Sequence, residues 1–546
     1  MKLTKYALMA AGCAMFAACS SDEPVQEAAA PNAPEAAGQD AGYVAFEIKL
    51  PTATGLGGRA AGDPVYDDGE AQEYAVINGN VIVFQNGATD ADTKVVCTVP
   101  LTGMSWTDPN GGQNVTTSTT AVAKLSGVSV TGDETYSAVV VLNSDSNFPM
   151  PAVGDNFATW STTPTDYPMI MEEGGQKYLT MTSAALLDGT TPKVLTNIDK
   201  TKIKATEAEA LNAGQAASFY VQRAVAKVTT KVNASYAPTG KDYANDQVKI
   251  LGWMCDITNK TSFPVQVTDG LTSDYAGIWS KSYFVGEGTP QRVYWGIDPN
   301  YKKVSETDAE TAFNHFTTAD LDNNGNPAKQ YVLENTFDLD DQMTWETTRI
   351  IVRANYTPAG FNDGDTFYRI SGDAKNYSKT GIEDAIKRQI SILFSKTGSV
   401  DLGSAATTAG VYALNAFNVT IDGAAATTEQ LNKIALGLGI VSSSEPGFST
   451  YQSGIAYYQA RIKHFGDELT PWQLGDPTYG TAYDKYLGRY GVVRNNSYEI
   501  SINSISQPGS AVVPPIEPGP DDESTYYMSV TVNLLSWAKR VQNVDL

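Results

Sequence analysis

The sequence ends on an alternating run that is typical of a β-strand, joined to the rest of the chain by a proline-rich arm. One face of this run is apolar at every second position: Tyr526, Met528, Val530, Val532 and Leu534. A side-chain period of two is that of a strand with one apolar face. The preceding residues, Pro514–Glu523, form a stiff acidic spacer without sheet or helix character. The strand therefore either folds back onto its own sheet or pairs with the sheet of another molecule.

A second strand with the same pattern lies near the N-terminus. Its apolar positions are Val44, Phe46, Ile48 and Leu50. A loop of small residues of the kind that proteases cut follows it, and Arg59 in this loop is the only arginine before Arg223. The sequence therefore predicts cleavage between Arg59 and Ala60. Two edge strands that can replace each other suggest strand replacement between molecules.

The first 18 residues have the features of an export signal. Lys2 and Lys5 precede a short apolar stretch, and Ala17, Ala18 and Cys19 follow it. The stretch is too short to span a bilayer. Small residues before a cysteine are typical of a bacterial lipoprotein signal, so we expect Cys19 to be the acylated first residue of the precursor. A plain secretory signal cut near Ala18 is the alternative.

Composition narrows the class of protein. The 546 residues have a formal net charge of −23, which disfavours binding to nucleic acid or to anionic lipid headgroups. Short alternating segments are separated by turn residues, and helices are few, so we expect a mainly β protein built from β-sandwich domains. Beyond Cys19 only Cys97 and Cys255 remain, and two buried free thiols are expected, with a disulfide left open.

Changes in composition and in the alternation of apolar residues along the sequence predict five segments. They are a signal peptide (1–18), a tether with the removable strand (19–59), an N-terminal domain (60–214), a C-terminal domain (215–510), and a linker with the last strand (511–546). A long strand over Phe219–Val232 is expected to open the C-terminal domain. Two helices are expected within it, Thr380–Lys396 after a Thr380/Glu383 capping box and Thr427–Leu438.

No stretch of the sequence has the pattern of an active site. His315 and His464 are the only histidines, too few for a histidine-based zinc site or a local triad motif. Asp320–Gly325 imitates the start of a calcium loop, but Tyr331 stands where the twelfth-position glutamate is required, so a polar turn is expected. We therefore expect no enzymatic activity, no metal and no cofactor.

Four further stretches resemble the fimbrillin family of Bacteroidetes-type (type V) pili, and most closely its shaft subunits of short fimbriae. They are Val221–Val228, Arg292–Tyr301, Tyr331–Asp338 and Gly488–Ile505, the last being the most specific. The resemblance implies two transthyretin-like β-sandwich domains, export as a lipoprotein, and an arginine-specific protease that removes the N-terminal strand. It also implies that the C-terminal strand of a neighbouring subunit then acts as a donor strand and fills the groove.

What the resemblance implies for function is a shaft subunit at the cell surface, derived from an outer-membrane lipoprotein precursor and supporting adhesion and biofilm formation. Its partners would be copies of itself, tip and anchor subunits, and the processing protease. A monomeric, lipid-anchored module that binds glycan or protein at the outer membrane is the main alternative. A secreted β-sandwich hydrolase is a third and weaker one.

Overall fold

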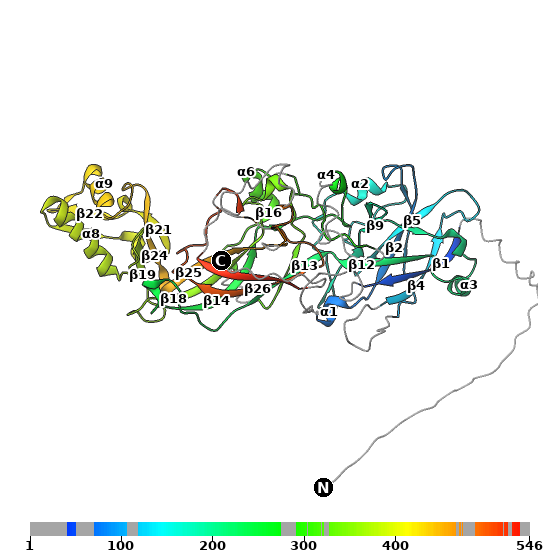
Figure 1. Ribbon diagram of the computed structural model, residues 1–546, viewed down its shortest axis with the longest axis horizontal. Helices are drawn as coiled ribbons and strands as arrows, with labels where there is room; N and C mark the ends of the chain where they lie inside the picture. The colour runs from blue at the N-terminus through cyan, green and yellow to red at the C-terminus, as the bar shows by residue number, and fades with distance from the viewer. Residues whose placement is uncertain are drawn as a thin grey trace, which may run out of the picture.

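The computed structural model describes residues 41–50, 70–105, 118–274, 291–302, 304–317, 319–320, 327–465, 469–470, 472, 486–516, 518–521 and 527–535. Three lobes follow one another along the long axis of the molecule (Figure 1). The N-terminal lobe lies at one end, a middle lobe contains the last strand, and a distal lobe with helices α8 and α9 lies at the other end.

The N-terminal lobe is one sheet that curls around a core. The strand order is β3-β2-β5-β8-β12-β1-β4, with β11 paired to β5. Thr102, just after β3, bridges Val122 of β4 with hydrogen bonds of 3.0 Å in each direction, so the two ends of the sheet meet. The strands are β1 Ala41–Lys49, β2 Gly79–Gln85, β3 Lys94–Pro100, β4 Ser118–Ser126, β5 Tyr136–Leu142, β8 Met181–Ser183, β11 Thr196–Ile198 and β12 Ala217–Arg223. Short elements decorate it: α1 Ala71–Tyr74, α2 Phe157–Ser161, α3 Glu207–Ala213, β6 Ile170–Glu173, β7 Gln176–Leu179, β9 Leu186–Asp188 and β10 Thr191–Lys193.

The middle lobe is a β-sandwich. One sheet has the order β17-β13-β26-β27 and the other β14-β18-β25, and a single apolar core lies between them. The strands are β13 Val225–Lys231, β14 Gln247–Asp256, β17 Gln330–Leu333, β18 Arg349–Thr357, β25 Ile455–Arg461, β26 Ser497–Ile505 and β27 Met528–Leu535. The smaller elements of this part of the chain are α4 Leu271–Asp274, α6 Glu306–Ala312, β15 Thr258–Asn259 and β16 Phe313–Asn314. The expected mainly β, sandwich-type architecture is confirmed.

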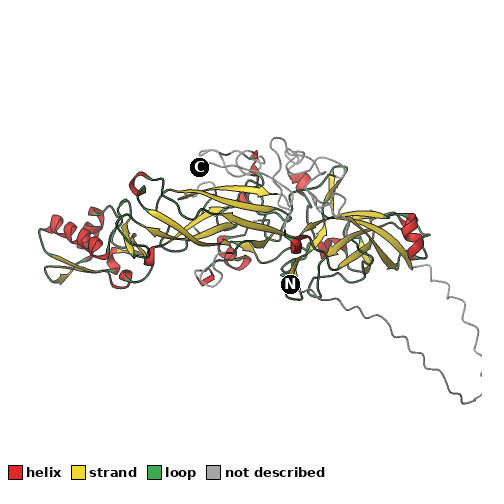
Figure 2. Cartoon of the chain, turned by 90° about the horizontal axis from the view of Figure 1, so that it is seen from below, coloured by secondary structure: helices red, strands yellow, loops and turns green. Residues whose placement is uncertain are grey.

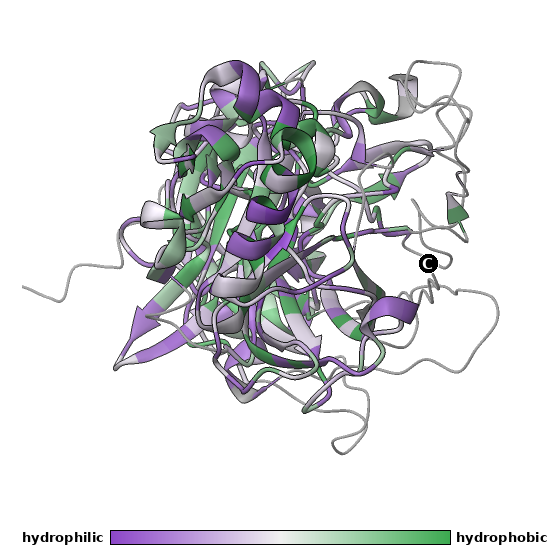
Figure 3. Cartoon of the chain, turned by 90° about the vertical axis from the view of Figure 1, so that its left-hand side faces the viewer, coloured by the Kyte–Doolittle hydropathy of each residue, from purple (hydrophilic) through white to green (hydrophobic). Residues whose placement is uncertain are grey.

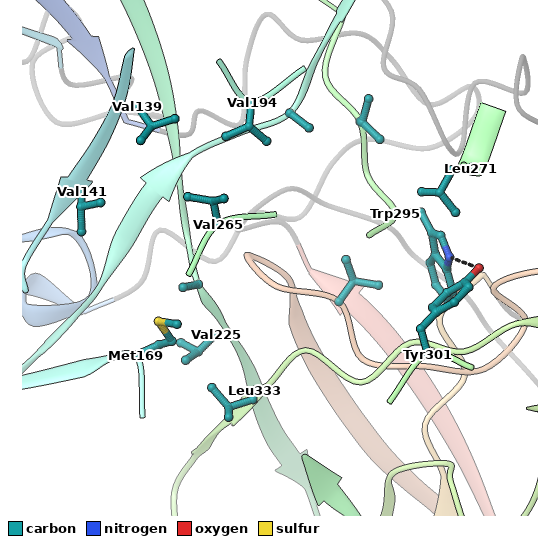
Figure 4. Close-up of a cluster of buried hydrophobic side chains, with 14 of the residues drawn as sticks. Val139, Val141, Met169, Val194, Val225, Val265, Leu271, Trp295, Tyr301 and Leu333 are labelled. Atoms are coloured by element: carbon teal, nitrogen blue, oxygen red, sulfur yellow. Dashed lines mark hydrogen bonds between the residues drawn. The ribbon is translucent and has the colours of Figure 1, made fainter. Parts of the chain in front are cut away.

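The boundary between the first two lobes differs from the expected one. The run Phe219–Val232 divides at Ala224, because β12 pairs in the N-terminal sheet and β13 in the middle sandwich. The N-terminal lobe therefore extends to Arg223 rather than ending near Gly214. An apolar cluster covers the junction and draws side chains from both lobes (Figure 4). Within it the indole N–H of Trp295 donates to the Tyr301 hydroxyl at 3.4 Å.

The distal lobe was expected only as helical decoration, and it has a core of its own. It is inserted between β18 and β25, which pair with each other. Its elements are α8 Lys379–Phe394, α9 Thr428–Gly437, β19 Phe367–Ile370, β20 Gly398–Asp401, β21 Gly410–Ala413, β22 Asn418–Ile421, β23 Ala424–Ala425 and β24 Pro446–Tyr451. Both expected helices are present and gather at this end of the molecule (Figure 2). The outer turns of the helices carry hydrophilic residues (Figure 3).

The first of these helices begins slightly earlier than expected. Ser378, rather than Thr380, caps α8, because its hydroxyl accepts a hydrogen bond from the Gly381 N–H at 3.1 Å. Thr427 caps α9 in a full capping box with Gln430. None of the helices in the described part of the chain is both long and apolar enough to cross a membrane.

Candidate functional site: the slot of the first strand

The first strand, β1, lies inside the N-terminal sheet and not at its edge, which corrects the expectation of an edge strand. It pairs in parallel with β12 from Phe46↔Ala217 to Lys49↔Tyr220. On its other side it pairs antiparallel with β4 over all nine of its residues. Removal of β1 would therefore leave two strands, β12 and β4, without their common neighbour. We call the space that β1 fills between them the slot.

Side chains of β1 make up part of the core of the lobe. Val44, Phe46 and Ile48 have no exposed surface, and Leu50 just after the strand is 5% exposed. Phe46 packs edge-on against Phe219 of β12, with 5.3 Å between ring centroids. Each fully buried side chain of this size contributes about 1.5–3 kcal/mol. An empty slot would thus expose both apolar surface and unpaired backbone groups, and a strand with the same alternation would fit it.

The outer face of β1 forms a hydrogen bond with β12 and contains an ion pair within the strand. The Ser218 hydroxyl donates to Glu47 Oε2 at 2.6 Å, and Lys49 Nζ lies 3.1 Å from the same carboxylate oxygen. Charged residues at the alternate positions therefore mark a polar outer face rather than a free edge. Cys19, Arg59 and Ala60 lie outside the described residues, and so does the loop 51–69 that follows the strand.

After that loop, Glu73 of α1 holds the chain in place, and no sequence pattern pointed to this residue. Its side chain is 1% exposed and accepts hydrogen bonds from Lys227 Nζ at 3.0 Å, Lys329 Nζ at 3.1 Å and the Tyr331 hydroxyl. Arg223 Nε donates to its backbone carbonyl at 2.7 Å. Glu73 thus joins the segment that follows this loop to both lobes, since Arg223 ends β12 and Lys227 lies on β13.

We expect Glu73→Gln to destabilise the protein by about 3 kcal/mol, because Lys227 would lose its buried counter-charge. Burial raises the pKa of Glu73, but the Tyr331 hydrogen bond and the charge of Lys227 outweigh it and hold the pKa below its usual range. The ionised carboxylate therefore stabilises the fold above about pH 4.3, and this stabilisation is lost as pH falls through the folded-state pKa. Urea unfolding at pH 7 and pH 3.5 measures both effects.

A surface pair supplies the control for this prediction. Glu172 pairs with Lys177 at 3.1 Å, and its side chain is 65% exposed. Glu172→Gln is expected to change stability by at most about 0.5 kcal/mol at either pH. Equal effects of the two substitutions at pH 7 would show that Glu73 does not hold the segment.

The last strand, β27, lies in the structure at the edge of its own middle-lobe sheet, which is the intramolecular arrangement that the sequence left open. It pairs antiparallel with β26 from Ile505↔Met528 to Ser497↔Leu535. Met528 and Val530 are 3% and 8% exposed and belong to the sandwich core. Val532 and Leu534 follow in the same ladder, opposite Ile500 and Tyr498. Tyr526 lies outside the described residues.

The arm before this strand is docked on the middle lobe through polar contacts. Arg349 Nη2 donates to the Pro514 carbonyl at 2.9 Å. Further along, Asp521 is fully buried, pairs with Arg461 Nε at 3.2 Å and accepts a hydrogen bond from the Thr347 hydroxyl. These contacts hold the arm against the middle lobe at Pro514 and at Asp521. If β27 leaves its sheet, we expect the chain to move only after Asp521.

The carboxyl group of Glu346, close to Asp521, stays neutral at pH 7. Burial, together with the negative charge of Asp341, raises the pKa of Glu346 to about 9. A protonated Glu346 therefore adds no negative charge to the buried surroundings of Asp521 at neutral pH. The Asp521 carboxylate lies 3.2 Å from Arg461 Nε in the same surroundings.

The other residues considered for chemistry have structural places. His464 is fully buried, and its Nδ1 lies 2.8 Å from the Tyr498 hydroxyl. Cys97 and Cys255 are both free thiols. No cluster of three or more His, Cys, Asp or Glu side chains within the described ranges could hold a metal ion. Asp320 begins the calcium-like turn, whose next residues, 321–326, are not among those described.

The C-terminal part of the chain is similar to a known protein family. Residues 449–543 match the family described as "Major fimbrial subunit protein type IV, Fimbrillin, C-terminal". This range contains β25, β26, the docked arm and β27. A search of curated proteins found no match.

Two solved structures overlap most of the chain loosely. A candidate cell adhesion protein from Parabacteroides distasonis is 14% identical, with a TM-score of 0.34 over 91% of this chain and 99% of its own. Another from Bacteroides eggerthii is 10% identical, with a TM-score of 0.34 over 92% and 98%. A TM-score of 0.34 is too low for a shared fold to be inferred.

Proposed function

We propose that this chain, whose C-terminal region belongs to the fimbrillin family, is a structural subunit of a cell-surface fimbrium that polymerises by strand exchange. The observation that supports this most is the pair formed by an interior first strand and an edge-bound last strand of similar length. β1 has nine residues and β27 eight, and both alternate apolar side chains with a period of two. The family match covers the second member of this pair.

Cleavage after Arg59 is the step that makes exchange feasible in this scheme. Before the cut, β1 is tethered to its slot at an effective concentration that no separate molecule can match. After the cut, the segment ending at Arg59 is a separate peptide, while Glu73 keeps the new N-terminus of the subunit in place. A strand from a neighbouring subunit can then enter between β12 and β4.

The incoming strand replaces the kind of contact that β1 makes. Five apolar side chains at about 1.5–3 kcal/mol each give roughly 8–15 kcal/mol before ordering costs. The strand must also leave β26, where Met528 and Val530 are already buried. However, β27 pairs on one side in the described sheet, whereas a strand in the slot pairs on both sides. The second ladder of backbone hydrogen bonds favours exchange.

The same scheme assigns the subunit to the shaft, because it has both a removable strand and a donor arm. Its partners are then copies of itself, together with the tip and anchor subunits at the ends of the fibre. The precursor is proposed to reach the outer membrane as a lipoprotein acylated at Cys19. Fatty-acid labelling of the wild type that persists in Cys19→Ser would contradict that step.

The cut is tested by Arg59→Ala. We expect this precursor to fold and be exported but to remain monomeric, because β1 stays tethered in its slot. Unboiled samples on denaturing gels should show a ladder for the wild type and one band for the variant. Arg388→Ala, an exposed substitution on α8, is the matched control and should leave the ladder unchanged. Assembly of the Arg59→Ala precursor into the same ladder would contradict the proposed role of the cut.

A second candidate function is a monomeric, lipid-anchored binding module at the outer membrane. The position of β27 in its own sheet favours it, because a strand that stays there has no need of a partner. A single band for the unboiled wild type, with an N-terminus that still begins at Cys19, would support this second function.

A further inference from the structure

The junction between the N-terminal and middle lobes encloses a small polar cavity of about 10 Å³. Gln222 contributes to it from β12, and Arg494 from the segment before β26, so both lobes line it. The four sequence stretches that resemble the fimbrillins each contribute to the structure around it. Most of the side chains that line it are polar or charged, although Val293 and Val493 also contribute. Such a lining is unusual for an interior position and calls for a compensating partner.

Arg494, which lines this cavity, has two buried hydrogen-bond donors without an acceptor among the described residues. The residue is 2% exposed, and its Nε donates to Glu334 Oε2 at 2.9 Å. Its Nη1 and Nη2 atoms are buried and have no hydrogen-bond partner among the protein groups that the structure describes. A buried donor without an acceptor costs about 1–3 kcal/mol, and more when it is charged. The cavity that Arg494 lines is the place from which an acceptor can reach these atoms.

Arg292, which lines the same cavity, is a second buried guanidinium. It is 4% exposed, and its Nη2 donates to Gln222 Oε1 at 2.7 Å. Gln222 in turn donates from its amide nitrogen to Gln266 Oε1 at 2.8 Å, so the side-chain hydrogen bonds of this arginine among the described residues lead to neutral amides. Burial lowers the pKa of Arg292 to about 10, which leaves it charged at neutral pH.

The charges that border the cavity do not balance. Two guanidinium groups face it, whereas Glu334 is the single carboxylate bonded to them among the described residues. Asp298 is the next carboxyl group, but it does not line the cavity, and its oxygens accept hydrogen bonds from Thr336 and Asn300. One positive charge is therefore left without a counter-charge in a low-dielectric interior.

We propose that this cavity binds a single small inorganic anion of the size of chloride, held between Arg292 and Arg494. A space of this volume accommodates about one water-sized particle, which excludes phosphate, sulfate and carboxylic acids. The anion would accept hydrogen bonds from the free Nη1 and Nη2 atoms of Arg494 and offset the charge of Arg292. Because the cavity has walls from both lobes, the bound ion would also hold them together. This site is independent of strand exchange.

The direct test is a crystal of the full-length precursor grown in sodium bromide, measured at the bromine absorption edge. We expect an anomalous peak in the cavity between the two arginines. In solution, the melting temperature should be about 2 °C or more higher in sodium chloride than in sodium gluconate of equal ionic strength. Gluconate is too large to enter. Equal melting temperatures in the two salts, or a bromide map without a peak in the cavity, would overturn the proposal.

Two variants separate ion binding from general salt effects. Arg292→Met removes the uncompensated charge and keeps an unbranched side chain, so its melting temperature should no longer depend on chloride. Arg388→Met removes an exposed arginine of α8 and should keep the full dependence. A chloride effect that persists unchanged in Arg292→Met would contradict the site. If Arg292→Met does not fold, the bromide map of the wild type decides.

Discussion

Phe46→Ala is expected to destabilise the uncleaved precursor by about 3–5 kcal/mol and to leave the assembled fibre unaffected. In the precursor the Phe46 ring is fully buried and packs against Phe219. In the proposed fibre, residue 46 leaves with the cleaved segment, so no side chain there would respond to the substitution. Urea unfolding of the precursor and thermal dissociation of fibres measure the two effects. A single substitution that changes one state and not the other is a signature of strand removal.

Phe219→Ala is the matched control for this prediction. Phe219 belongs to β12, borders the slot and remains in the mature subunit. Its loss should therefore weaken both the precursor and the fibre. Should Phe46→Ala precursor not be recovered, Ile48→Val offers a milder change of about 1 kcal/mol with the same asymmetry. Fibres that Phe46→Ala weakens as much as the precursor would show that β1 is retained after assembly.

Deletion of residues 522–546 is expected to abolish polymerisation while the subunit stays folded. The docked arm remains because Asp521 is retained, and β26 keeps its parallel partner β13. Loss of Met528 and Val530 from the sandwich edge lowers the melting temperature, but the remaining strands still enclose the core. Circular dichroism of the uncleaved, truncated precursor, in which β1 still fills the slot, tests folding, and electron microscopy of the truncated subunit after cleavage tests polymerisation. A truncated chain that unfolds, or one that still forms fibres, would contradict it.

A pair of point substitutions sharpens the same test. Val530 is 8% exposed and faces the apolar core, whereas Ser529 beside it is half-buried on the opposite face. Val530→Asp should prevent fibre growth, because a charge in an apolar slot costs several kcal/mol unless it is paired. Ser529→Asp should reduce growth much less. Equal loss with both substitutions would indicate that the apolar face of β27 does not enter the slot.

Local pattern was enough to predict many of the elements, because alternation and capping depend on near neighbours. Both helices of the distal lobe begin and end within a few residues of the expected positions. The same signal could not show that β1 is interior. A period of two tells which face is apolar, not how many neighbours a strand has. The run Phe219–Val232 likewise alternates through Ala224 without any sign that it changes sheets.

The residues that hold the candidate site together could not be found by pattern, because their partners are far away in the sequence. Glu73 is bonded to Lys227 and Lys329, more than 150 residues further on. Asp521 looked like one acid in an acidic spacer, and only the fold brings Arg461 to it. Each of these contacts depends on the packing of complete lobes. Burial of a charge is the property that marks such residues, and it becomes visible only with the structure.

A cryo-electron microscopy map of assembled fibres is the most direct test of strand exchange. Side-chain density for the strand between β12 and β4 would identify its residues. We predict that this strand comes from the C-terminal run Tyr526–Leu534 of a neighbouring subunit, reached from a docked arm that ends near Asp521. A map in which residues 41–49 of the same subunit still fill the slot, with β27 still paired to its own β26, would contradict it.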